Sequence, residues 1–136
     1  MTMVNDYEGL FTAKQQDELE NIVRSFRAET GIEIAIVTID STYTTKDKFD
    51  DYSLHLANKW HLGQKGKDNG ILIGISRGLR KMRIENGYGI EKILSDQETQ
   101  DVIDKYFIPY YKNGDYYKGT LTGLRALIDF LRAANR

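Results

Sequence analysis

The sequence contains no cysteine and only one proline among its 136 residues. Without cysteine there are no disulfides, no thiolate zinc sites and no thiol catalysis. No stretch approaches the roughly 18 apolar residues of a membrane span, and the first residues lack the basic and apolar segments of a signal peptide. A formal net charge of -1 argues against general affinity for nucleic acid or anionic membranes. We therefore expect a soluble protein, whose compartment the sequence leaves open.

The composition is that of an ordinary folded protein. Hydrophobic residues make up 40% of the chain and charged residues 29%. A chain of this length can bury a sizeable core, and we find no repeat, low-complexity tract or linker that would divide it. We predict a single domain over residues 1–136.

Apolar spacing and capping signals predict four helices. The first begins at Thr12, which forms a capping box with Gln15, and ends at Gly31. Its buried stripe is Leu19, Ile22, Val23 and Phe26. The second spans about residues 46–60. The third follows a capping box of Ser95 and Glu98 and is expected to end at Pro109, and Gly114-Asp115 opens the last.

Three apolar segments predict strands. The segment Ile32 to Ile39 is rich in β-branched residues, and Ile71 to Ile75 is a second core strand. The turn at residues 77–80 returns the chain as an antiparallel partner over residues 82–84. A helix joins the first two strands, so they should be parallel. Helices around a small mixed sheet predict a three-layer α/β/α sandwich.

Two glycine-rich loops locate the candidate site. Residues 66–70 lead into the second strand, and Gly87-Tyr88-Gly89 leaves the third. Because these strands form a hairpin, both loops should lie at one edge of the sheet. Oxygen donors gathered there suit a hard cation such as Ca²⁺ or Mg²⁺, although glycines also make plain turns and carboxylates also cap helices. The predicted ligand pool is Asp68, Asn69, Glu85, Glu91 and Asp96.

Four segments carry a resemblance to a known family. They are residues 4–7, 60–70 (with the block KGKDNG), 83–89 (RIENGYG) and 114–116. In this order they resemble the motifs of the TPM domain family, over nearly the whole chain. The resemblance implies a Rossmann-like α/β/α sandwich that binds a divalent metal, often calcium. The family includes thylakoid-lumen proteins with acid phosphatase activity and bacterial envelope proteins.

Two functions are consistent with that resemblance. The first is weak, metal-assisted hydrolysis of phosphomonoesters, in which Lys67 or Arg83 would neutralise charge and Asp68 would act as nucleophile or orient water. The second is a non-catalytic assembly or chaperone-like module with a structural metal and a protein partner. The tyrosines that could form its binding patch, although we favour packing as their role, are Tyr106, Tyr110, Tyr111, Tyr116 and Tyr117.

One further polar segment has an alternative interpretation. Residues 40–44 superficially resemble the D-x-S-x-S metal loop of von Willebrand A-type domains. The chain is short for that fold, and such residues commonly form a turn and cap a helix. We interpret them as a turn.

Overall fold

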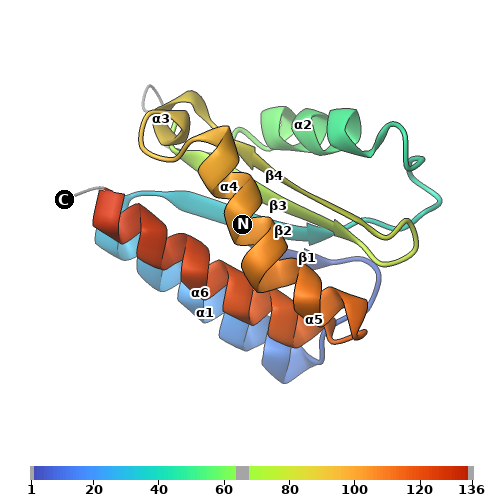
Figure 1. Ribbon diagram of the computed structural model, residues 1–136. Coiled ribbons are helices and arrows are strands. Elements are labelled where there is room, and N and C mark those ends of the chain that lie inside the picture. The colour runs from blue at the N-terminus through green and yellow to red at the C-terminus, as the bar shows by residue number, and fades with distance from the viewer. Residues whose placement is uncertain (1, 64–67, 135–136) are drawn as a thin grey trace. The chain divides into compact units, whose positions relative to one another are not determined.

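The computed structural model describes residues 2–63 and 68–134. It consists of two compact units, Met1–Ile90 and Glu91–Arg136. The first holds a sheet with its flanking helices, and the second is helical (Figure 1). The prediction of one domain over the whole chain stays a prediction.

The sheet of the first unit has four strands in the order β1-β2-β3-β4. They are β1 (Val4–Asp6), β2 (Glu33–Thr38), β3 (Gly70–Ser76) and β4 (Lys81–Asn86). β2 pairs in parallel with β1 and β3, whereas β3 and β4 form an antiparallel hairpin. The predicted parallel pair and the predicted hairpin are both confirmed, and β1 is an additional edge strand.

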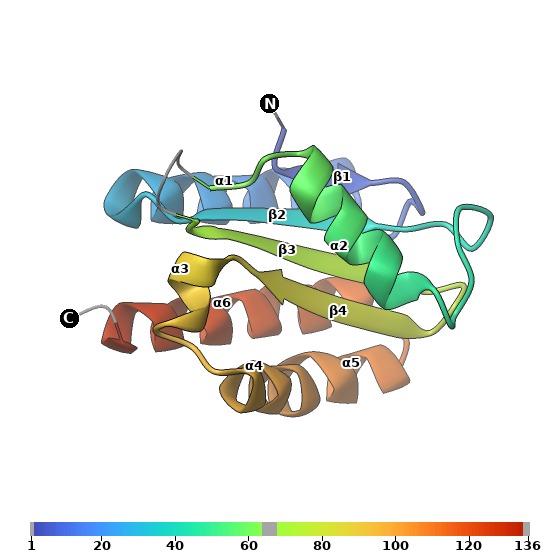
Figure 2. The same cartoon turned by 90° about the horizontal axis from the view of Figure 1, so that it is seen from above.

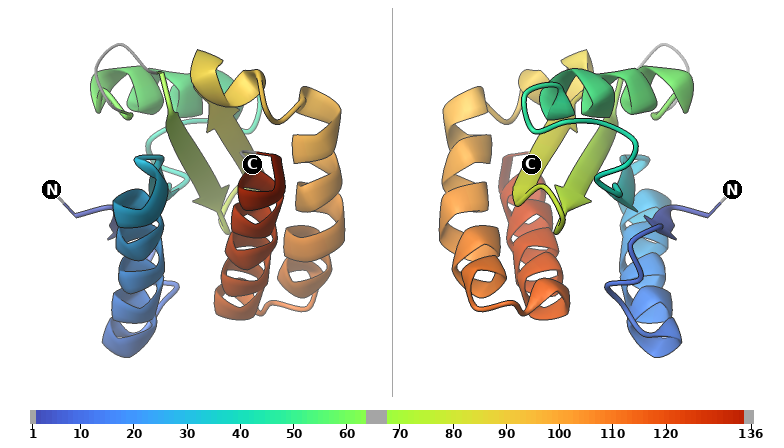
Figure 3. Two further views of the ribbon diagram at one scale, coloured as in Figure 1. Left: turned by 90° about the vertical axis from the view of Figure 1, so that its left-hand side faces the viewer. Right: turned by 90° about the vertical axis from the view of Figure 1, so that its right-hand side faces the viewer.

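Helices cover both faces of this sheet. α1 (Ala13–Thr30) packs against β1 and β2, and α2 (Phe49–Lys59) packs against β3 and β4. The two helices lie on opposite faces (Figure 3). Apolar residues of β2 and β3 are fully buried, and this burial is the main source of stability. The predicted α/β/α sandwich is therefore the fold of this unit.

The ends of α1 follow the predicted signals. Thr12 and Gln15 form a capping box, and Gly31 has the left-handed φ of 80° that ends the helix. The second helix is shorter than predicted, because it begins at Phe49 and its N-cap, Lys48, makes no capping hydrogen bond. Trp60 follows its last residue.

Side chains of α1 also occupy the outer edge of β1. The amides of Met3 and Val4 both donate to the Glu20 carboxylate, at 2.9 to 3.1 Å. Gln16 Nε2 donates to the Val4 carbonyl at 3.1 Å. The backbone groups of Val4 on the side away from β2 are thereby satisfied by the helix.

The second unit contains α4 (Asp96–Val102), the π-helical segment η1 (Ile103–Phe107), α5 (Ile108–Lys112) and α6 (Tyr116–Ala134). The predicted capping box of Ser95 and Glu98 is confirmed. The prediction that Pro109 ends the helix is wrong, because helical structure continues through it to Lys112. Pro109 lies in the first turn of α5, where a missing N–H is tolerated, and the π turn before it adjusts the hydrogen bonding.

Close packing joins η1 to α6. Phe107 is fully buried, and a Cβ added at Gly123 would overlap its ring. Tyr111 lies beside it with 6.1 Å between ring centroids, stacks on Tyr116 at 4.8 Å, and shares a 2.7 Å hydrogen bond with Thr120. Burial raises the pKa of the Tyr111 hydroxyl. Two of the five clustered tyrosines, both half-buried, therefore pack against neighbouring side chains of this unit.

The other three tyrosines, Tyr106, Tyr110 and Tyr117, are half-buried. Lys118 Nζ lies 5.3 Å from the centre of the Tyr110 ring, a distance at which a cation and an aromatic face attract. None of the five is among the most exposed large apolar side chains of the described residues. Within the described residues 2–63 and 68–134, no helix is both long enough and apolar enough to cross a membrane.

Candidate functional site

The two glycine loops meet at one end of the β3–β4 hairpin. The Gly87 amide donates to the Gly70 carbonyl at 2.8 Å, and the Gly89 amide donates to the Asp68 carbonyl at 2.9 Å. A Cβ at Gly87 would overlap the Asp68 carbonyl oxygen, so only glycine allows this approach. The short helix α3 (Tyr88–Glu91) begins at the same place (Figure 2). The predicted juxtaposition is confirmed.

Asp68 has an unusual backbone at this junction. Its φ is 51°, in the left-handed region that few residues other than glycine adopt. The residue is exposed, while its carbonyl is held by Gly89. Lys67, which with Arg83 was one of the two predicted neutralising cations, lies outside the described residues. The junction thus presents the Asp68 carboxylate on a backbone whose carbonyl is held by Gly89 of α3.

A second set of contacts anchors the base of the loop. The Asn69 carbonyl accepts from the Glu33 amide at 3.2 Å, and Asn69 Nδ2 donates to the Gly31 carbonyl at 2.9 Å. Glu33 Oε1 accepts from the Gly63 amide at 2.7 Å, and Glu33 Oε2 pairs with Arg27 at 3.0 Å. Asn69 was predicted as a metal ligand. In the structure its side-chain nitrogen donates the hydrogen bond to Gly31 that holds the base of the loop. No local pattern singles out Glu33, because its role depends on tertiary contacts.

The second predicted carboxylate, Glu85, is held by an arginine. Arg83 Nε lies 2.8 Å from Glu85 Oε1, and Arg83 Nη1 lies 3.9 Å from Asp50 in α2. The alternation of β4 had left the direction of Glu85 open, and these contacts place it with Arg83 on the face that α2 covers. Its side chain is only 13% exposed, so the ion pair compensates a largely buried charge.

The remaining two candidates belong to the second unit or its boundary. Glu91 is the last residue of α3 and is exposed. Asp96 is the first residue of α4, directly after the N-cap Ser95, where a carboxylate is favoured by the helix dipole alone. In residues 2–63 and 68–134, no three His, Asp or Glu side chains gather closely enough to hold a metal. The five-residue ligand pool therefore stays a prediction, led by Asp68.

The polar segment after β2 forms a turn. The Thr42 amide donates to Asp40 Oδ1 at 2.9 Å, and the Tyr43 amide donates to the Asp40 carbonyl at 3.0 Å. The hydrogen bond from the Thr42 amide, with a smaller contribution from its hydroxyl, holds the pKa of Asp40 below its ordinary value. These local bonds support our interpretation of residues 40–44 as a turn.

Comparison with solved structures finds the same fold in three bacterial proteins. The N-terminal domain of a P. gingivalis protein has a TM-score of 0.87 and 29% identity, over 98% of this chain and 83% of that one. The BA42 protein of the psychrophilic bacterium Bizionia argentinensis has a TM-score of 0.78 and 19% identity, over 94% of this chain and 86% of that one. The N-terminal domain of a Corynebacterium glutamicum protein has a TM-score of 0.70 and 14% identity, over 95% of this chain and 79% of that one.

Comparison with curated proteins finds no match. The sequence pattern of the TPM domain, in contrast, matches residues 4–130. That range includes both glycine loops and the strands that bring them together. The chain therefore belongs to the TPM domain family.

Proposed function

We propose that this domain binds a hard divalent cation, Ca²⁺ or Mg²⁺, at the junction of the two glycine loops, with Asp68 as its carboxylate ligand. The observation that carries the proposal is the left-handed backbone of Asp68, held through its carbonyl by Gly89. Such a conformation costs free energy and persists only where its surroundings impose it, which is common at binding sites. Here it leaves the carboxylate exposed.

A cation at this point would need oxygen ligands beyond Asp68, and the carbonyls of residues 68–70, each of which accepts one backbone hydrogen bond, retain a second lone pair. Ca²⁺ takes about six to eight oxygen ligands, and it accepts carbonyls and water beside carboxylates. Asp68 contributes one carboxylate, while Glu85 is already paired with Arg83. A cation bound by one exposed carboxylate, backbone carbonyls and water should be held with modest affinity.

Removal of the Asp68 carboxylate tests this proposal. A ligand specific to the native state, at about 100 times its Kd, stabilises it by about 2.7 kcal/mol, or roughly 8 °C in Tm for a chain of this size. We expect Ca²⁺ or Mg²⁺ to raise the Tm of chelator-treated protein, and Asp68→Ala to abolish the rise. Thermal unfolding and calorimetric titration with each cation measure both quantities.

Asp17→Ala is the matched control, because Asp17 is an exposed aspartate on α1, away from the glycine loops. It should keep the full response to both cations. An equal response in wild type and Asp68→Ala would remove Asp68 from the site. Loss of response in both variants would show that general surface charge, not a site, attracts the cation.

A weak phosphomonoesterase activity at the same junction is the second function that we propose. A bound cation would supply charge stabilisation to the phosphoryl oxygens. In this chain Asp68 would orient the attacking water or act as nucleophile. Arg83 would contribute only if a substrate drew its guanidinium from Glu85 and Asp50. That competition is one reason to expect slow turnover.

The assay substrate is 4-nitrophenyl phosphate, with and without chelator. We expect hydrolysis that requires the divalent cation, falls by about 100-fold or more in Asp68→Ala and persists in Asp17→Ala. Turnover that survives both the chelator and Asp68→Ala would assign the activity to a contaminant. Cation binding without any turnover would instead support the non-catalytic assembly module with a structural metal.

A further inference from the structure

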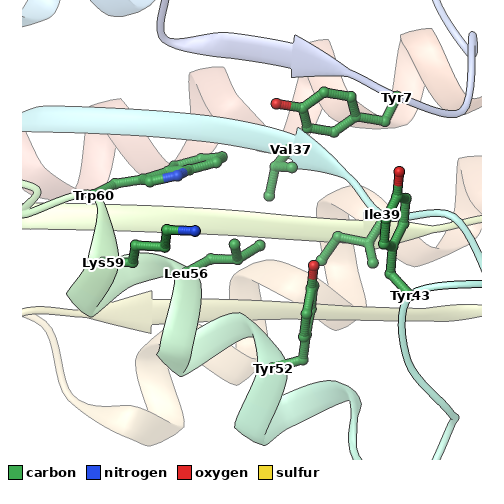
Figure 4. Close-up of a pocket in the computed structure, with 8 residues that line it drawn as sticks. All are labelled: Tyr7, Val37, Ile39, Tyr43, Tyr52, Leu56, Lys59 and Trp60. Carbon is green, nitrogen blue, oxygen red and sulfur yellow. The ribbon is translucent and has the colours of Figure 1, made fainter.

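A cavity separate from the glycine loops lies in the first unit, between α2 and the β1–β2 side of the sheet (Figure 4). Its volume is about 300 Å³. α2 packs on β3 and β4, so this side of the same sheet face is left with less helical cover. The lining residues are Tyr7, Val37, Ile39, Tyr43, Tyr52, Leu56, Lys59 and Trp60.

The cavity has an apolar floor and an aromatic rim. Val37 and Ile39 on the floor are 1% and 2% exposed. Half of the eight lining residues are aromatic, against 11% of the chain, so the enrichment is specific to this place. Tyr7 and Tyr43 are 62% and 64% exposed, although large rings usually find cover. Exposed rings around a concave apolar floor are typical of a ligand site.

One charged group enters this aromatic surface. Lys59 is the only charged residue of the lining, and Figure 4 shows its ammonium extending into the space beside Leu56 and Trp60. Within residues 2–63 and 68–134, Lys59 takes part in none of the ion pairs, and its side chain is exposed. The lining contains no acidic residue. The charge of the cavity is therefore complementary to an anion.

We propose that this cavity binds a small aromatic carboxylate. Its volume is at the lower end of the range for small-molecule sites, which suits one ring with a short acidic side chain. The ring would pack on Val37 and between the aromatic side chains, and the carboxylate would meet Lys59. This site is independent of the cation site, since none of its lining residues belongs to the glycine loops.

Trp60 provides a direct readout, because it is the only tryptophan of the chain and lines the cavity. Its fluorescence is excited at the red edge of indole absorption, where phenyl rings do not absorb. The probes are phenylacetate, neutral phenylacetamide and cationic phenethylamine, which share one ring. We expect a saturable change with phenylacetate, with a Kd on the order of 1 mM, about fivefold weaker binding of the amide, and still weaker binding of the amine.

Two kinds of variant separate the contribution of the Lys59 charge to binding from the contribution of aromatic stacking. Lys59→Gln should equalise phenylacetate and phenylacetamide, while Lys14→Gln on α1 should keep the preference. Tyr43→Ala should weaken both ligands about tenfold, since stacking area is lost. Leu54→Ala is the control for an exposed apolar residue on α2 outside the lining, and it should leave both affinities unchanged. Unchanged circular dichroism in each variant confirms folding.

Three outcomes would overturn the proposal. Absence of a saturable fluorescence change would mean that the cavity binds no such ligand. Equal affinity for the three probes in wild type would remove the role of Lys59. A pentapeptide ending in phenylalanine that bound much more tightly than phenylacetate would assign the cavity to a polypeptide partner.

Discussion

Replacing Phe107 by alanine is expected to lower the free energy of unfolding by about 3 to 5 kcal/mol. Phe107 of η1 is fully buried. Its ring packs so closely against Gly123 of α6 that a Cβ added at Gly123 would overlap the ring. Truncation would open a cavity that the surrounding helices fill only in part. Urea unfolding followed by far-ultraviolet circular dichroism measures the change in midpoint.

Phe130→Ala is the matched control, because it makes the same truncation on α6 at a residue that is 40% exposed. It should change the free energy of unfolding by less than about 1 kcal/mol. Similar losses in the two variants would show that close packing of Phe107 is not what stabilises the helical unit.

Gly87→Ala is expected to disrupt the junction of the two glycine loops. The added methyl group would overlap the Asp68 carbonyl oxygen, which belongs to backbone and cannot rotate away. The loops would have to separate, at a cost of about 1 to 3 kcal/mol in stability. Because the Asp68 backbone would then lose its support, we also expect the rise in Tm with Ca²⁺ or Mg²⁺ to disappear.

Gly114→Ala provides the comparison for strain without overlap. Gly114 has a positive φ of 79°, but no atom lies within 4 Å of a Cβ built there. It should lose about 1 kcal/mol in stability and keep the full cation response. If Gly87→Ala retained that response, the position of Asp68 would not depend on the approach of the two loops.

Local signals in the sequence correctly predicted both ends of α1 and the start of α4. The capping boxes at Thr12 and Ser95 and the left-handed Gly31 each depend on residues only a few positions apart, so their outcome is decided within one turn. The same holds for the hairpin, whose turn at residues 77–80 joins β3 to β4. Because hairpin geometry fixes which strand ends are neighbours, the meeting of the glycine loops could also be predicted.

Features that depend on distant contacts could not be predicted. β1 has only three residues, too few for a periodic pattern, and its hydrogen bonds come from β2 and α1. Pro109 was expected to end a helix, yet the π turn of η1 accommodates it. The aromatic cavity combines Tyr7 with residues of α2 that lie some fifty positions later in the sequence. Glu85 was also ambiguous, until its pairing with Arg83 fixed its direction.

The contacts of Glu20 and Gln16 with β1 have a consequence for self-association. An edge strand normally offers a row of open amides and carbonyls on which another chain can build intermolecular β-structure. Here the outward-facing amide and carbonyl of Val4 already form hydrogen bonds with side chains of α1, and the strand is short. The first strand of the sheet is thus a poor template for fibril growth.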